Sequence, residues 1–373
     1  MTANPFLPER STLQNIQILR FFAAFWVAFY HAGDPLIPSH LMPELPKWLH
    51  AIQKGGFAGV DLFFVISGFI MALNIEHLNS SGTNSIRFLG VRFARIYAGW
   101  WPFFFLYWAL FWAADSMEGR DLLGSWFLLP MGLNQYLLPI IWTLSFELYF
   151  YLFVSMLILA RPAWRIAIVV AVVWLHVVAV LLSMQLGFFT PQRFMETWPW
   201  HQFYLHPLVL EFLAGFALFK IYERGWLGYP MWWLIGSFLC FIAAAVYQKH
   251  ALAFDAARSG MDGYFHSPER AALLGSWAVA LVTFSVLTRP WFGAAAKHLV
   301  KLGDASYVIY LSHIIIIIAM MRVLMFFEWP HAGRPLYYLL TLAAIIIYSL
   351  LHHQTIEAPL YRFFRRGIYK ILP

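Results

Sequence analysis

The sequence LRFFAAFWVAFYHA, at residues 19–32, is predicted to form an apolar helix that carries two ionisable side chains. The stretch is apolar apart from Arg20 near its start and His31 near its end, eleven positions apart. In an α-helix this spacing is about three turns, so both side chains project from one face, roughly 16 Å apart. Ionisable side chains are costly inside an apolar span. Either the two residues line a polar pathway through an apolar layer, or Arg20 extends to lipid headgroups and His31 is a hydrogen-bonded interior histidine.

The composition indicates a membrane protein. Of the 373 residues, 61% are hydrophobic and 12% are charged, whereas soluble domains typically have about 25% charged residues. An apolar segment of about 20 residues can cross a bilayer as a helix. Ten segments qualify: residues 14–33, 56–75, 94–114, 142–160, 164–186, 203–222, 230–248, 270–288, 306–326 and 336–354. We therefore predict an all-α, polytopic membrane protein with about ten transmembrane helices.

One further apolar segment, 122–141, is interrupted by Pro130, Gly132, Asn134 and Pro139. Irregular backbone is tolerated at membrane depth only where it is buried in protein or lines a cavity. We predict a re-entrant or interfacial segment that leads into the fourth span. The single cysteine, Cys240, excludes an internal disulfide and a cysteine-clustered metal site.

The lysines and arginines gather in the loops on one side of the predicted bundle. That side collects Arg10, Arg87, Arg92, Arg95, Arg161, Arg165, Lys220, Arg224, Arg289, Lys297, Lys301, Arg362, Arg365, Arg366 and Lys370. Cytoplasmic loops carry such an excess, so we predict that both termini are cytoplasmic. The net charge of +7 therefore reflects membrane topology, and no nucleic-acid partner is predicted.

This orientation places three titratable residues from three helices at a similar depth. His31 lies near the outer end of the first span, Asp61 in the outer third of the second, and Glu147 about one and a half turns below the outer face of the fourth. A histidine beside carboxylates can act as a general base with an orienting partner. The alternative for Asp61 is a cap or hydrogen bond to a neighbouring helix. An unpaired Glu147 would cost several kcal/mol, which favours a functional role.

The ninth predicted span carries four polar residues on one helix face. They are Ser306, Tyr307, Tyr310 and His313, at spacings of three, four and seven. His313 is predicted near the middle of the membrane. Packing inside the bundle and lining a polar pathway are equally compatible with this position.

Arginines crowd the entrance to the third span, at Arg87, Arg92 and Arg95. The arginine fork binds phosphate oxygens with two parallel hydrogen bonds. The simpler interpretation is that these residues only set topology or bind lipid headgroups.

Short motifs run through nearly the whole chain in a fixed order. They are Arg20 and His31 with ten residues between them, GVDLFFVISGF at 59–69, Arg92 with Arg95, WTLSFE at 142–147 followed by Phe150 and Tyr151, GDASY at 303–307 followed by Tyr310, Leu311 and His313, and EAPL at 357–360. Together they resemble the acyltransferase-3 family of integral membrane O-acyltransferases, many of which modify bacterial exopolysaccharide, lipopolysaccharide O-antigen or related glycans. The opening LQNIQILR, 13–20, is most similar to the exopolysaccharide-acetylating branch. One departure is Ala98, where the family commonly has proline, so the third helix is expected to begin less sharply.

The resemblance implies an acyl-CoA donor, most often acetyl-CoA, that arrives from the cytoplasm, and a glycan acceptor at or beyond the membrane. It also implies a single membrane domain over residues 1–373 in the cytoplasmic (inner) membrane. Membrane lipids and polysaccharide biosynthesis machinery are the expected partners, and no metal is expected. The domain is expected to act without an appended hydrolase-like domain, alone or with a separate partner. The expected catalytic residues are His31, Glu147 and Asp61, the CoA-binding residues are Arg20, Arg92 and Arg95, and the substrate-binding residues are Ser145, Trp142, Tyr310 and His313.

In the expected reaction, His31, oriented by Glu147 or Asp61, deprotonates a sugar hydroxyl that attacks the thioester. An acyl-histidine relay is a variant of this scheme. The alternative function is a proton-coupled transporter or a flippase for a glycan or lipid-linked intermediate, in which the same residues form a proton relay. Detectable internal repeats would favour that alternative, and none is found. An accessory scaffold is disfavoured, because it gains nothing from so many buried ionisable groups.

Overall fold

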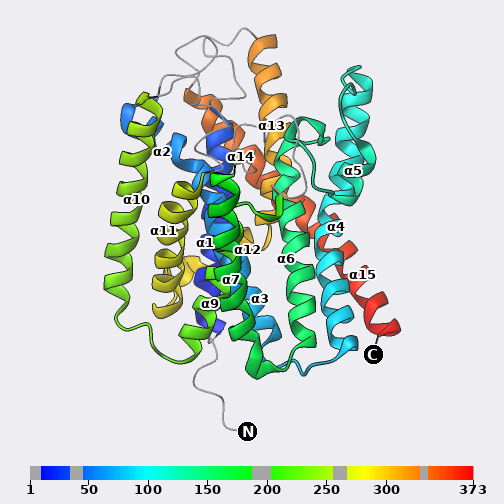
Figure 1. The fold of residues 1–373 in the computed structure, drawn as a ribbon. Helices are drawn as coiled ribbons and strands as arrows, with labels where there is room; N and C mark the ends of the chain where they lie inside the picture. The colour runs from blue at the N-terminus through cyan, green and yellow to red at the C-terminus, as the bar shows by residue number, and fades with distance from the viewer. Residues whose placement is uncertain (1–9, 34–44, 187–202, 255–266, 328–334, 373) are drawn as a thin grey trace. The chain divides into compact units, whose positions relative to one another are not determined.

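The computed structural model describes residues 10–33, 45–186, 203–254, 267–327 and 335–372, and these are folded into helices and connecting turns without strands (Figure 1). Within these described ranges, seven helical stretches are long and apolar enough to cross a membrane. They are Lys47–Ile75, Pro139–Leu159, Pro162–Ser183, Pro230–His250, Pro268–Leu287, Ser306–Phe326 and Leu336–Ile371. The protein is therefore an all-α, multi-pass membrane protein, as the sequence predicts.

The count of about ten spans stays a prediction, because three expected spans fall outside these seven. The first lies in α1 (Arg10–His31), which includes Asn15, Gln17 and Arg20 among its apolar residues. The third lies in α4 (Gly82–Ala113), and the sixth lies in α9 (Val209–Glu223), which has only 15 residues.

The chain divides into two compact units. Of the described residues, unit 1 comprises 64–186, 203–254, 267–287 and 361–372, and unit 2 comprises 10–33, 45–63, 288–327 and 335–360. Two helices, α3 (Gly59–Ile75) and α15 (Ala358–Ile371), therefore contribute residues to both units.

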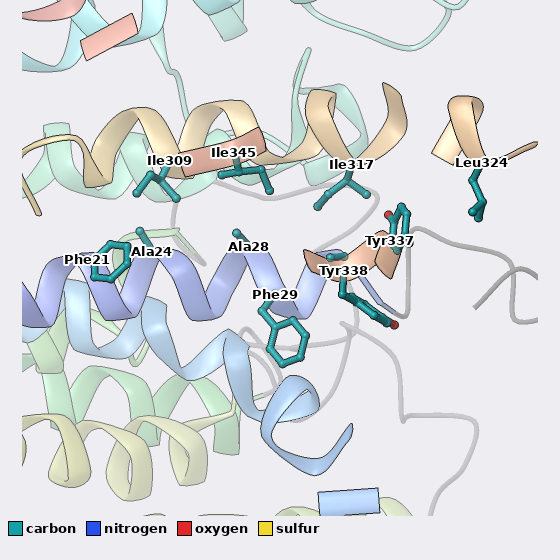
Figure 2. Close-up of a cluster of buried hydrophobic side chains, with 11 residues drawn as sticks. Phe21, Ala24, Ala28, Phe29, Ile309, Ile317, Leu324, Tyr337, Tyr338 and Ile345 are labelled. Atoms are coloured by element: carbon teal, nitrogen blue, oxygen red, sulfur yellow. The ribbon is translucent and has the colours of Figure 1, made fainter. Parts of the chain in front are cut away.

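Helix α1 is the centre of unit 2. It contacts α2 (Lys47–Lys54), the 3-10 helix η2 (Gly55–Ala58), α12 (Ala296–Asp304), α13 (Ser306–Phe326) and α14 (Pro335–His352). Ala24, Ala28 and Ala32 are fully buried at intervals of four residues, and Figure 2 shows the first two on the side of α1 that faces Ile309 and Ile345. Small side chains on one face let helix backbones approach closely, so this alanine stripe brings α1 against α13 and α14.

Glycines from two other elements pack directly against the backbone of α1. A Cβ added to Gly303 of α12 would overlap the carbonyl oxygen of Gln17, and one added to Gly59 would overlap that of Ala23. Both glycines belong to the motifs quoted above. Their role is therefore to let α12 and the start of α3 pack directly on α1, which fixes the helix that carries Arg20 and His31.

In unit 1 the helices form a row in which each helix contacts the next. Contacts join α4 to α6 (Trp142–Leu159), α6 to α7 (Pro162–Gln185), α7 to α9, α9 to α11 (Pro268–Leu287), and α11 to α10 (Pro230–Phe254). The unit 1 part of α3 crosses α9 at two glycines. A Cβ on Gly68 would overlap the carbonyl oxygen of Phe212, and one on Gly215 would overlap that of Val65. Neither position can hold a larger residue at this separation.

The predicted irregular segment 122–141 contains α5 (Leu122–Phe127) and the 3-10 helices η3 (Leu133–Gln135) and η4 (Pro139–Ile141). It returns along α4: the ring of Trp126 stacks on Trp101, with centroids 4.9 Å apart, and Trp100 Nε1 donates to the carbonyl of Ser125. Trp101 precedes the end of α4 by twelve residues, or about 18 Å along the helix. The backbone is irregular where the sequence predicts it, and the path leads back toward the middle of α4.

Several boundaries differ from the prediction. Helix α4 is continuous from Gly82, twelve residues before the predicted start at 94. A span predicted from a run of apolar residues covers only the membrane-spanning part of a helix. Arg87 and Arg92 interrupt the apolar run, but the helix continues through both residues. The amphipathic helices α2, α12 and α15 are not predicted from the sequence for the same reason. A π-helical segment, His353–Glu357, joins α14 to α15.

Candidate active site

Two histidines form the centre of the candidate site in unit 2. His31 is the last residue of α1, and His313 lies in α13 and is fully buried. His313 Nε2 lies 3.1 Å from His31 Nδ1, and the ring centroids are 4.9 Å apart. The sequence predicts both residues for the site, but it does not predict this contact.

One arrangement of protons satisfies all the contacts of this pair. His313 Nδ1 lies 3.3 Å from the carbonyl oxygen of Ile309, and His31 Nδ1 lies 3.0 Å from that of Val27. A neutral imidazole carries one N–H donor and one acceptor nitrogen. With a proton on each Nδ1, His313 donates to the carbonyl oxygen of Ile309, and the single His31 Nδ1–H is shared between the carbonyl oxygen of Val27 and His313 Nε2. His31 Nε2 then keeps its lone pair, as a general base requires.

The end of α1 that carries His31 is held by α2 and η2. Gln53 Nε2 donates to the carbonyl oxygen of Phe29 at 3.0 Å, and Gly33 packs directly on the Gln53 side chain. Trp26 Nε1 donates to the carbonyl oxygen of Ile52. These bonds satisfy backbone groups at a helix end, where α-helices leave carbonyls unpaired within the helix. They also restrict the position of the His31 backbone.

Tyr310 and Asp61 lie in the same unit. The ring of Tyr310 lies 5.8 Å from His313 and 6.4 Å from Phe63 between centroids. Asp61 is fully buried in the first turn of α3, where the positive end of the helix dipole favours a carboxylate. Arg20, half-buried in α1, donates from Nη1 to Gln17 Oε1 at 3.2 Å. Unit 2 thus holds both ends of the predicted Arg20 to His31 stripe.

Unit 1 holds the other predicted residues, and one tyrosine connects two of them. Glu147 accepts hydrogen bonds from Ser67 Oγ at 3.3 Å and from the Tyr151 hydroxyl at 3.4 Å. The Arg92 guanidinium lies over the Tyr151 ring, 5.9 Å from its centroid. Tyr151 therefore links the Glu147 carboxylate to the first arginine of the Arg92 and Arg95 pair. A tyrosine four residues after a glutamate on one helix face could have been predicted to reach it.

The remaining predicted residues of unit 1 have partners of their own. Arg95 lies over the ring of Tyr361 at 5.7 Å. Ser145 Oγ lies 2.9 Å from the hydroxyl of Tyr136 in the returning segment, and Trp142 packs edge-on against Phe64. The expectation that Glu147 orients His31 joins residues of different units, and it stays a prediction.

Comparison with known proteins identifies the family of the chain. The acyltransferase-3 profile, described as an acyltransferase domain, matches residues 13–353. The chain belongs to the acyltransferase-3 family. The matched region includes all ten predicted site residues, and membership makes this acyltransferase an enzyme that transfers acyl groups to oxygen. A curated relative is the exopolysaccharide production protein ExoZ of Rhizobium meliloti (strain 1021), which is 28% identical over 287 residues, covering 71% of this chain and 79% of ExoZ. No solved structure matches the chain significantly.

Proposed function

We propose that this acyltransferase transfers an acyl group, most simply acetyl, from acyl-CoA to a hydroxyl of an exported or surface polysaccharide in the cytoplasmic membrane. The observation that carries the catalytic part is the contact between His31 and His313, which fits an unprotonated Nε2 on His31. The acceptor class follows from the similarity to ExoZ, whose name assigns it to exopolysaccharide production.

In the proposed reaction His31 Nε2 takes the proton of the sugar hydroxyl. The resulting oxygen nucleophile attacks the thioester carbonyl, the C–O bond forms, and the C–S bond breaks. The CoA thiolate leaves and takes the proton back from the imidazolium, so that free CoA and an acylated sugar are the products. His313 orients the His31 ring, and Asp61 or Glu147 stabilises the imidazolium. In the acyl-histidine variant, His31 attacks the thioester first and then passes the acyl group to the sugar.

The proposed donor site uses arginines for the phosphates of CoA. Arg92 and Arg95 lie ten and thirteen residues after the first residue of α4, and Arg20 lies on α1 about 16 Å from His31 by helical rise. An extended pantetheine arm is of the same order as that separation, which suits a donor lying along α1. Trp142, Ser145 and Tyr310 are proposed to contact the acceptor sugar.

Proteoliposomes with purified protein, labelled acetyl-CoA and an oligosaccharide acceptor test this function. Labelled oligosaccharide is the expected product. Movement of the oligosaccharide across the membrane without labelled product would instead support the transporter, and neither result with any acceptor from a panel of surface glycans would contradict transfer from acetyl-CoA.

A further inference from the structure

Helix α15, which lies beyond the last predicted span, packs against α4 within unit 1. Ile368 of α15 packs on Gly90 of α4 at ordinary van der Waals distance, and Arg87 Nε donates to the carbonyl oxygen of Leu372 at 3.1 Å. The contact between Arg95 and Tyr361 lies at the other end of the same interface. The segment 361–372 is therefore attached along the helix that carries the proposed CoA-binding arginines.

A cavity of about 740 Å³ lies between these two helices. Aromatic side chains form much of its lining: Phe93, Tyr97 and Trp101 from α4, and Phe363 and Phe364 from α15. Its two cations, Arg366 and Lys370, both come from α15. A site with this lining can hold a flat aromatic group against its rings and an anion at its edge.

A second, open cavity of about 550 Å³, lined by exposed side chains of α15 alone, shares these two cations. Its other lining residues are Arg362, Arg365 and Tyr369, so four of its five side chains are cationic. Arginine forks match phosphate oxygens, and lysine adds a point charge. An aromatic cavity and a cationic cavity thus lie next to each other, connected through Arg366 and Lys370.

The ligand that fits both cavities carries an aromatic base next to several phosphates. A neutral sugar lacks the phosphates, and a phospholipid lacks the flat base. We propose that α15 and α4 bind the nucleotide end of acyl-CoA, with adenine in the aromatic cavity and the phosphates on the cations of α15. This inference rests on the proposed function, and it extends the donor site beyond Arg92 and Arg95.

The first test compares donors with and without the nucleotide. The variant is Arg366→Gln with Lys370→Gln, and the control is Arg161→Gln with Arg224→Gln, which removes the same charge from exposed positions of unit 1. Hydrogen bonds to charged groups account for roughly ten- to hundredfold in affinity. We expect the variant to weaken CoA binding by isothermal titration, and to raise KM for acetyl-CoA, by about that factor. Transfer from S-acetylpantetheine, which has no nucleotide, should stay at the wild-type rate, and the control should behave as wild type in both assays.

A second variant, Phe363→Ala, tests the aromatic cavity at a side chain that is 71% exposed, so that its removal leaves the interior intact. Stacking on an aromatic ring strengthens the binding of a base, and we expect CoA affinity to fall roughly tenfold.

The outcomes separate this inference from the proposed function. Unchanged CoA affinity in both variants, with normal transfer from acetyl-CoA, would overturn the inference and leave the function standing. Weakened CoA binding in the variants, in a protein that transfers nothing from acetyl-CoA, would support the nucleotide site and contradict the function. Effects seen in nanodiscs with anionic lipid but not in pure phosphatidylcholine would assign the cations to lipid headgroups and overturn the inference.

Discussion

At the scale of single residues, the two imidazoles of unit 2 differ in their burial. His31 ends its helix and is half-buried, whereas His313 is fully buried and bonded to the backbone of its own helix. The more accessible ring is therefore suited to react, and the enclosed ring is suited to hold it in place.

Replacing His31 by alanine should nearly abolish transfer. General base catalysis contributes about 10² to 10⁴ in rate, so labelled acetyl transfer in proteoliposomes should fall by that factor while CoA affinity and protein level stay normal. His298→Ala, on the exposed side of α12, is the matched control and should retain activity. Wild-type transfer by the His31→Ala protein would remove this residue from the mechanism.

Two substitutions at His313 distinguish positioning of His31 from a purely structural role. Glutamine can place a polar group near the position of Nε2, whereas asparagine reaches only the position of Nδ1. Because His313 Nε2 contacts His31 Nδ1, His313→Asn should lower kcat about tenfold or more at unchanged KM for acetyl-CoA, since a lost hydrogen bond to a buried group costs about 1–3 kcal/mol. His313→Gln should recover part of that loss. Equal kcat in the two variants would argue that His313 only packs.

At the scale of elements, close backbone contact at glycines fixes how helices pack inside each unit. In unit 2, Gly303 and Gly59 let α12 and the start of α3 pack closely against α1. In unit 1, Gly68 and Gly215 let α3 and α9 pack closely against each other. The motif glycines at 59, 68 and 303 thus have a packing reason that is independent of catalysis.

The α3–α9 crossing can be tested by adding one methyl group. Gly68→Ala would push a Cβ into the carbonyl of Phe212, and overpacking of this kind costs typically about 1–3 kcal/mol. The thermal unfolding midpoint in detergent should fall. Gly236→Ala on α10, where nothing lies within 4 Å of the added Cβ, should leave it unchanged or raise it through higher helix propensity. An unchanged midpoint for Gly68→Ala would show that the crossing has room to relax.

At the scale of the whole molecule, the distribution of lysine and arginine predicts which loops face the cytoplasm. In a Cys240→Ser background, a cysteine at Ser116, between α4 and α5, should react with a membrane-impermeant maleimide in intact cells. A cysteine at Lys297, on α12, should react only after permeabilisation. Both positions are exposed, so a failure to label reflects the membrane rather than burial. The reverse pattern would invert the topology and place the arginines of α4 and α15 away from cytoplasmic CoA.

Local patterns in the sequence determined the fold class and the family. Apolar segments of membrane-spanning length predict the helices, and the ordered motifs from Arg20 to Glu357 predict an acyltransferase, because both kinds of signal lie within short stretches of chain. Helix ends were predicted less well, since α4 and α15 continue into charged residues that an apolar count excludes.

Which side chains meet depends on how distant segments of the chain pack together. His31 and His313 are 282 residues apart in sequence, and their contact exists because an alanine stripe and a glycine bring α1 against α13 and α12. The link from Glu147 through Tyr151 to Arg92 and the cavities between α4 and α15 likewise depend on how helices pack. Packing is the sum of many weak contacts between distant segments. The pattern of residues within one segment therefore does not specify which other segment it packs against.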